Sequence, residues 1–333
     1  MTTQKPQLIY ASDYPDRLIR SINQAKKHIF IVETTFRTDD DKAKAIASAL
    51  CDAKKRGVKI SIGVDSFTYM EPDGFKLTIL RQQSARVFQS FGLERQLIRA
   101  GINFKWLGRR TSFLMLGRTH AKWVVVDDEV YIFGGVNLDH ESFNNVDYVF
   151  WLKDENLAKE VILEHKKILK AERIGGAFRS RSYKIDEKST ALFDGGFVAN
   201  SIIYKRACTL AKAAKRIVFV SQYCPTGELS RIFRKKKTKM YFNHWRNASA
   251  SNRLIISFGM MSSRHKTLYK RDKYLHGKLI IFEMENGEKV ALSGSHNFMA
   301  TSGLMGTREV AIETKDQEYI SQLEDFIQKH VAL

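Results

Sequence analysis

The sequence predicts an α/β protein of two similar halves, each a mixed, mostly parallel β-sheet flanked by helices. Two observations predict this class. Apolar, strand-like runs alternate with helical patterns through short links, and the order of elements seen early in the chain returns after residue 200. A hairpin that begins with His-x-Lys also occurs twice. We therefore expect an internal duplication, with residues 1–175 as the N-terminal half and residues 176–333 as the C-terminal half.

The first half opens with two helix–strand units, a pattern typical of parallel strands covered by helices. The polar stretch 174–188 is expected to link the halves, and residues 113–116 are expected to pack in the core or in a lid. The other predicted elements are helices over residues 16–28, 39–57, 85–101 and 155–173 and strands over residues 29–36, 58–65, 102–107 and 146–152.

The second half repeats these units in a similar order. The apolar run at residues 254–259, LIISFG, is predicted to be the strand that corresponds to residues 58–65. Residues 231–252, rich in lysine and arginine, follow no regular pattern and are expected to form an exposed basic loop or helix. The remaining predictions are helices over residues 204–215, 226–234 and 317–330 and strands over residues 217–224 and 308–314.

The repeated hairpin spans residues 120–137 and residues 276–297. Side chains two apart on a strand point to the same face, so His120 projects with Lys122 and His276 projects with Lys278. Each copy ends in a glycine-containing turn and an asparagine. Two copies of such an ordered set favour a shared functional site over a chance pair of surface residues.

An acid follows each His-x-Lys pair, Asp127 in the first copy and Glu283 in the second. Both lie an odd number of residues from their histidine, so on a regular strand they point to the opposite face. We therefore expect these acids to make turn and scaffold hydrogen bonds and to take no part in proton transfer. The turns themselves are predicted at residues 127–129 and at residues 285–288, where Asn-Gly favours a tight turn.

These motifs resemble the phospholipase D superfamily, whose signature is His-x-Lys-x(4)-Asp, then a Gly-Gly or Gly-Ser turn and an asparagine, twice in each active site. The one departure is Glu283, which stands where the family has aspartate. The resemblance implies that the halves are related by a pseudo-two-fold axis and share one site. It also implies that His120 attacks phosphorus to form a phosphohistidine, while His276 serves as general acid and then as base.

The same resemblance assigns the remaining site residues. Lys122, Lys278, Asn137 and Asn297 would bind the non-bridging phosphate oxygens in place of a metal, so no metal and no cofactor are expected. Asp147 and Glu309 lie 27 and 33 residues after the histidines of their copies. They resemble the family's acids that hydrogen-bond the imidazole Nδ1 and hold its tautomer.

Composition limits the kinds of partner and site that this protein can have. The net charge is +19, which indicates an anionic partner, either nucleic acid or an acidic membrane surface. Three scattered cysteines exclude a disulfide framework or a zinc site. No apolar run reaches the roughly 18 residues needed to span a bilayer, and the N-terminus has no signal pattern. We therefore expect a cytoplasmic protein that associates peripherally with membranes.

Residues 21–65 resemble the opening of bacterial cardiolipin synthases, and residues 97–107 and 221–233 resemble later segments of the same family. That resemblance implies phosphatidyl transfer or hydrolysis on a phospholipid. Two alternatives stay open, a metal-independent nuclease of the same superfamily acting on DNA or RNA and a non-catalytic module that binds anionic ligands. The acceptor (water or an alcohol), the lipid headgroup and the oligomeric state are not indicated by the sequence.

Overall fold

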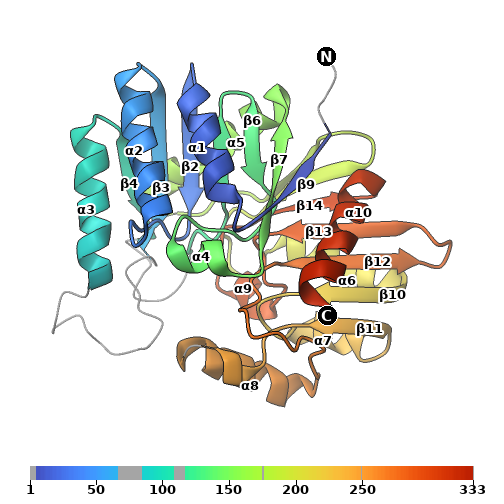
Figure 1. Cartoon of the computed structure of the whole chain (residues 1–333). Helices are drawn as coiled ribbons and strands as arrows, with labels where there is room; N and C mark the ends of the chain where they lie inside the picture. The colour runs from blue at the N-terminus through green and yellow to red at the C-terminus, as the bar shows by residue number, and fades with distance from the viewer. Residues whose placement is uncertain (1–4, 67–84, 109–116, 175, 249, 333) are drawn as a thin grey trace.

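The computed structural model describes residues 5–66, 85–108, 117–174, 176–248 and 250–332, in which layers of helix and sheet alternate (Figure 1). Within these residues the chain forms two seven-stranded sheets, with strand orders β1-β7-β6-β5-β2-β3-β4 and β11-β10-β12-β13-β14-β9-β8. The expected segment 113–116 and the division expected at residue 175 fall on undescribed residues, so both stay predictions.

The first sheet is built from the N-terminal part of the chain. Its strands are β1 Gln7–Tyr10, β2 His28–Glu33, β3 Lys59–Asp65, β4 Asn103–Leu107, β5 Trp123–Val126, β6 Glu129–Ile132 and β7 Tyr148–Lys153. The helices of this part are α1 Tyr14–Gln24, α2 Asp41–Lys55, α3 Ala85–Arg99, α4 His140–Asn144 and α5 Glu155–Ile174.

The second sheet repeats the arrangement. Its strands are β8 Arg181–Lys184, β9 Ser189–Phe193, β10 Ala214–Val220, β11 Lys237–Tyr241, β12 Leu279–Met284, β13 Lys289–Gly294 and β14 Val310–Thr314. The helices are α6 Ile202–Ala213, α7 Gly227–Phe233, α8 Ala250–Ser263, α9 Ala300–Leu304 and α10 Gln317–Phe326, which a π-helical turn, Ile327–Val331, extends. No helix among the described residues is both long and apolar enough to cross a bilayer.

The sheets are mixed, as predicted, but the prediction that they are mostly parallel is wrong. Only the pairs β2–β3, β3–β4 and β10–β11 are parallel among the described strands, and the other neighbours are antiparallel. Parallel neighbours need a long crossover, which the helix–strand units at the start of each half provide. Strands β5 and β12, which begin just after the two His-x-Lys motifs, instead return through tight turns, and such turns join antiparallel strands.

Three further sequence predictions are corrected, for residues 254–259, for the basic stretch 231–252 and for the expected link 174–188. The run at residues 254–259 lies within α8, because a short apolar run fits a helix as well as a strand. The parallel neighbour of β10 is β11, and it takes the place expected for residues 254–259. Strand β11 lies in the stretch expected as a basic loop or helix, and its lysines alternate along an exposed sheet edge. Strand β8 lies in the expected link, and α4 precedes the strand expected near residue 146.

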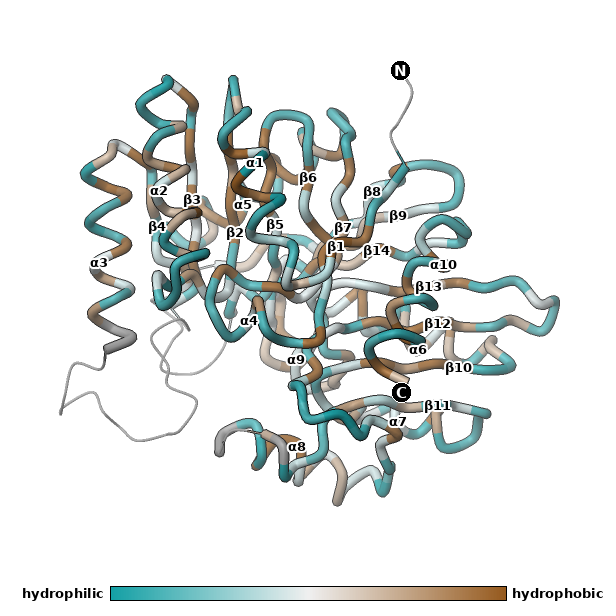
Figure 2. Tube along the Cα trace, in the orientation of Figure 1, coloured by the Kyte–Doolittle hydropathy of each residue, from teal (hydrophilic) through white to brown (hydrophobic). Residues whose placement is uncertain are grey.

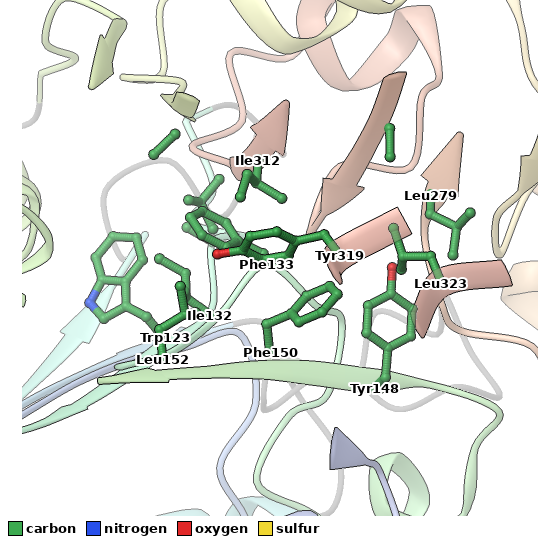
Figure 3. Close-up of a cluster of buried hydrophobic side chains, with 14 of the residues drawn as sticks. Trp123, Ile132, Phe133, Tyr148, Phe150, Leu152, Leu279, Ile312, Tyr319 and Leu323 are labelled. Carbon is green, nitrogen blue, oxygen red and sulfur yellow. The ribbon is translucent and has the colours of Figure 1, made fainter. Parts of the chain in front are cut away.

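The hydrophobic cores explain the layers. One core packs α1, α2 and α3 on the outer face of the first sheet, and another packs α6 and α7 on the outer face of the second. The central core joins the inner faces of both sheets with α5 and α10 between them, and its side chains from the two halves meet in Figure 3. Figure 2 shows the matching hydropathy, with hydrophobic stretches along the strands of the first sheet.

The two halves exchange matching contacts, as a two-fold relation requires. Helix α5 reaches the second sheet, where Glu164 accepts a hydrogen bond from Arg181 of β8. Helix α10 reaches the first sheet, where Gln322 accepts from the Leu8 N–H of β1 at 2.7 Å. At the centre, Tyr148 of the first half lies 2.6 Å from the Ser293 hydroxyl of the second. The central core therefore does not belong to either half alone.

Each His-x-Lys hairpin ends in a turn where one position requires glycine. A Cβ atom added to Gly134 would lie 1.9 Å from the Tyr148 carbonyl oxygen, and one added to Gly294 would lie 2.2 Å from that of Val310. Real Cβ atoms do not approach a backbone oxygen so closely. The glycine lets the turn pass against the neighbouring strand, which carries the site acid just before it.

We predict that Gly134→Ala destabilises the protein by about 3 kcal/mol or more, because the backbone of β7 must shift to admit the methyl group. Urea unfolding at neutral pH measures the effect. The matched control is Gly92→Ala in α3, where a Cβ would meet nothing within 4 Å. Helix propensity there favours alanine by up to about 1 kcal/mol. Equal midpoints for the two variants would contradict the close-approach argument.

Candidate active site

Each histidine of the repeated motif is held by a carboxylate from the other half of the chain. His120 Nδ1 lies 3.0 Å from Glu309 Oε2, and His276 Nδ1 lies 2.6 Å from Asp147 Oδ2. In each pair the acid accepts the Nδ1–H, which leaves Nε2 as the nitrogen with a free lone pair. The two pairs are therefore crossed between the halves.

The backbone around the histidines makes the same crossing. The N–H groups of His120 and Ala121 both donate to the Arg308 carbonyl, at 2.9 and 2.8 Å. In the other copy, the N–H groups of His276 and Gly277 donate to the Val146 carbonyl, both at 3.0 Å. Arg308 and Val146 are the residues that precede the two acids. Each histidine is thus docked on the segment that supplies its own carboxylate.

Both lysines of the motif are buried beside their histidines. Lys122 Nζ donates to the His120 carbonyl and to the Thr34 hydroxyl, both at 2.9 Å, and Lys278 Nζ donates to the His276 carbonyl. Burial lowers the pKa of both ammonium groups, and for Lys278 it lowers the pKa to about 7, with Lys122 adding to the effect. Two cations held out of water in this way favour an anion placed between them.

The two asparagines are buried near the histidines with different partners. Asn137 Nδ2 donates to the Ser142 hydroxyl at 3.2 Å, and its Oδ1 accepts from the Thr35 N–H. Asn297 is also buried, and its Oδ1 has no hydrogen-bond partner among the described residues. An unsatisfied buried amide oxygen costs free energy, and a hydrogen-bond donor placed there would relieve that cost.

The motif acids Asp127 and Glu283 make no recorded contact with a histidine of the site. Asp127 accepts hydrogen bonds from the backbone N–H groups of residues 26–28, which lower its pKa against the opposing effect of partial burial. Glu283 lies 3.6 Å from the guanidinium of Arg216 on the neighbouring strand β10. Both acids therefore support strand ends away from the site.

Electrostatics keep the two imidazoles neutral and the two acids ionised. Burial lowers the pKa of His120, and burial together with Lys278 lowers the pKa of His276 to about 4. Burial alone would raise the pKa of Glu309, but His120 outweighs it and brings the pKa to about 2. Burial would also raise the pKa of Asp147, but the hydrogen bond from His276 and the charge of Lys278 outweigh it and lower the pKa. A neutral imidazole is the form that can attack phosphorus.

Three residues near the site were not predicted from the sequence. Ser295 donates its hydroxyl to Glu309, and His296 is buried with its Nε2 lacking a partner among the described residues. Glu33 ends the apolar strand β2 as a buried acid whose pKa burial raises well above its usual value, against the opposing charge of Lys122. In the sequence, Glu33 could have been recognised as an acid at the end of an apolar strand. Ser295 could have been recognised because it stands where the first copy has Gly135.

Among the described residues no group of three or more histidines, cysteines, aspartates or glutamates lies close enough to hold a metal ion. The cysteines in this part of the chain are free thiols, and Cys208 and Cys224 are buried. The cations nearest the histidines are the two lysine ammonium groups described above.

Comparison with known sequences finds similarity in the N-terminal half. Residues 18–169 match the family described as cardiolipin synthase, phospholipase D-like domain. Cardiolipin synthase B of Salmonella typhi and that of Salmonella typhimurium are each 30% identical to this chain over 139 residues. The matched stretch covers 40% of this chain and 29% of each Salmonella protein, so it spans less than a third of these relatives.

Solved structures extend the comparison to both halves. A phosphatidylserine synthase of Haemophilus influenzae superposes with a TM-score of 0.72 at 13% identity, over 98% of this chain and 86% of that one. A polyphosphate kinase of Porphyromonas gingivalis superposes with a TM-score of 0.61 at 11% identity, over 97% of this chain and 50% of that one. At these identities the comparison concerns the fold, which the two structures share across almost the whole chain.

The crossed pairs lead to a prediction about His120. Its pKa is raised by the Glu309 charge against the larger effect of burial, so Glu309→Gln should lower that pKa further. An NMR titration of the imidazole resonances measures the shift. Glu313→Gln on the same strand β14, where the glutamate pairs with Arg206, is the control and should leave His120 unchanged. A raised or unaltered His120 pKa in Glu309→Gln would contradict the assignment.

Proposed function

We propose that this chain, a member of the phospholipase D superfamily, transfers the phosphatidyl group of a phospholipid to water or to an alcohol through a phosphohistidine. The observation that carries the proposal is the crossed arrangement, in which two neutral imidazoles with Nδ1 tied to a carboxylate stand beside two buried lysines. Phosphodiester transfer needs a nucleophile, a proton donor for the leaving oxygen and cations for the non-bridging oxygens.

The first step forms a phosphorus–nitrogen bond. His120 Nε2 attacks the phosphodiester phosphorus, the phosphorus–oxygen bond to the leaving alcohol breaks, and that oxygen takes a proton from His276. We assign attack to His120 from the family resemblance, and its side chain, 22% exposed against 10% for His276, is the more accessible of the two. Glu309 stabilises the positive charge that the ring of His120 gains in this step.

The second step reverses the proton transfer. His276, now neutral, takes a proton from water or from an acceptor alcohol, whose oxygen attacks phosphorus and releases His120. Lys122 and Lys278 hold the non-bridging oxygens throughout, with Asn137 and Asn297 beside them. A bound phosphate anion would offset the repulsion between the two lysines and raise the pKa of His276, so the proton donor is formed when substrate binds.

The lipid substrate is proposed from the relatives that match. The family description and the Salmonella proteins name cardiolipin synthase, and the Haemophilus structure is titled a phosphatidylserine synthase. A nuclease acting on DNA or RNA is the second candidate, and the net charge of +19 is the observation that favours it. A non-catalytic module is the third, and the paired ionised acids and neutral imidazoles count against it.

We predict that His120→Ala or His276→Ala each lowers turnover of a phospholipid by about 10⁴-fold or more. The double variant should lose little beyond either single change, because residues that act as a unit are not additive. Turnover is measured by release of the labelled headgroup. Appreciable activity in both single variants would show that the two histidines do not share one site.

An activated ester separates the roles of the histidines. A p-nitrophenyl phosphodiester has a leaving group that departs without protonation, so His276→Ala should release one equivalent of nitrophenol in a burst and accumulate phosphohistidine. His120→Ala should give no burst. The opposite pattern would assign attack to His276 and leave the two-histidine mechanism intact with its roles exchanged.

We predict that turnover survives EDTA without loss, because lysine and asparagine side chains take the place of a metal at the phosphate. The assay should use a soluble short-chain phosphodiester, so that effects of divalent ions on vesicles do not enter. A dependence on added Mg²⁺ or Zn²⁺ would overturn this part of the proposal.

A further inference from the structure

Helix α8 has an apolar stripe that faces away from the protein. Leu254, Phe258 and Met261 are 74%, 71% and 80% exposed, and their spacing places them along one side of the helix. Figure 1 shows α8 at the lower edge of the molecule, outside the stacked layers. Exposed apolar side chains gathered on one helix face mark an interaction site more often than scattered ones do.

The opposite side of α8 is anchored to the protein, so the direction of the stripe is set. The Asn252 side chain accepts a hydrogen bond from Tyr223 at 2.6 Å, and the Ser263 hydroxyl lies 3.1 Å from Cys224 Sγ. Ile256 is fully buried. Asn252, Ile256 and Ser263 lie on the far side of the helix from Phe258. At 3.6 residues per turn, each is rotated from Phe258 by roughly 120–160° about the helix axis.

The segment that anchors α8 also contacts residues near the active-site motif. Tyr223 and Cys224 follow the end of β10, where the Ser221 hydroxyl donates to the Asn297 carbonyl at 3.1 Å. Gln222 of the same segment donates to the Tyr274 hydroxyl, also at 3.1 Å, two residues before His276. The segment that anchors α8 therefore also contacts Asn297 and Tyr274, and Tyr274 lies two residues before His276.

The surroundings of α8 are strongly basic. Asp272 is the only acid between residues 229 and 273. Lysines and arginines occur before the helix, within it and after it, and most are exposed: Arg231, Arg234, Lys235, Lys237, Lys239, Arg246, Arg253, Arg264, Lys266, Lys270 and Lys273. A helix with an apolar stripe and cationic flanks is the form that lies in the interface of an anionic bilayer.

We infer that α8 docks the protein on an anionic phospholipid bilayer, with Leu254, Phe258 and Met261 inserted at the headgroup–acyl boundary and the basic residues on lipid phosphates. The inference rests on the proposed lipid substrate and adds the surface through which the site reaches it. A second copy of this chain is disfavoured as occupant by like charge, and a nucleic-acid backbone would leave the apolar stripe without a partner.

The stripe is tested with the triple variant Leu254→Ser, Phe258→Ser, Met261→Ser. Cosedimentation with vesicles of phosphatidylglycerol and phosphatidylcholine should show at least a tenfold loss of affinity relative to the unchanged protein. Leu163→Ser on α5, where the leucine is 43% exposed, is the matched control and should bind as before. Turnover of a soluble short-chain phosphodiester should be unchanged in both, which establishes that the site is folded.

The charge is tested with Lys235→Gln, Lys237→Gln, Lys239→Gln. Lys236 is left in place because it donates to the Ala214 carbonyl and supports the fold. This variant should bind the same vesicles more weakly and with a smaller dependence on salt. Pure phosphatidylcholine vesicles should bind the unchanged protein at least tenfold less tightly than the anionic ones.

Failure of the docking inference can be told apart from failure of the proposed function. Binding needs no turnover, so His120→Ala should bind anionic vesicles as tightly as the unchanged protein. Lipid turnover with unaltered vesicle binding in the α8 triple variant would overturn the docking inference alone. Vesicle binding through α8 without turnover of any phospholipid would instead overturn the lipid substrate. Loss of DNA affinity, with vesicle binding unchanged, in the charge variant would overturn both.

Discussion

The structure depends on a crossed arrangement in which each half supplies the carboxylate that the histidine of the other half requires. Glu309 serves His120 and Asp147 serves His276, while two backbone N–H groups beside each histidine bind the carbonyl just before each acid. Neither half holds a complete set. Since an ionised group buried without a partner costs several kcal/mol, the halves are held in one relative position by the same contacts that assemble the site.

Charge balance follows from this crossing. Two buried lysines and two buried carboxylates act on the histidines, so their charges partly offset one another in the resting site. The same burial that lowers the pKa of Lys278 to about 7 lowers the pKa of His276 to about 4. An entering phosphate monoanion changes this balance in favour of the protonated forms. Under the proposed mechanism, the site is therefore prepared for an anion and acquires its proton donor when one arrives.

The duplicated halves are not equivalent in detail. Ser295 donates to Glu309 in the second copy, whereas Gly135 occupies the matching position in the first. A Cβ at Gly135 would lie 2.6 Å from the Asp147 carboxylate, so no side chain fits there. Glu33 beside Lys122 has no acidic counterpart in the second half, where Ser221 follows the end of β10 at the matching position. Such differences separate the two histidines chemically, as is required when one attacks and the other protonates. They also limit how far the sequence symmetry describes the site.

The sequence by itself determined the duplication and the β/α units that open each half, because these follow from periodicity and spacing. It could not determine the strand directions elsewhere or the state of residues 254–259, since a short apolar run fits a strand or a helix until neighbours choose. Which acid serves which histidine was decided only by the tertiary structure. The two partners lie 189 and 129 residues apart, and their contact arises from the packing of one half on the other.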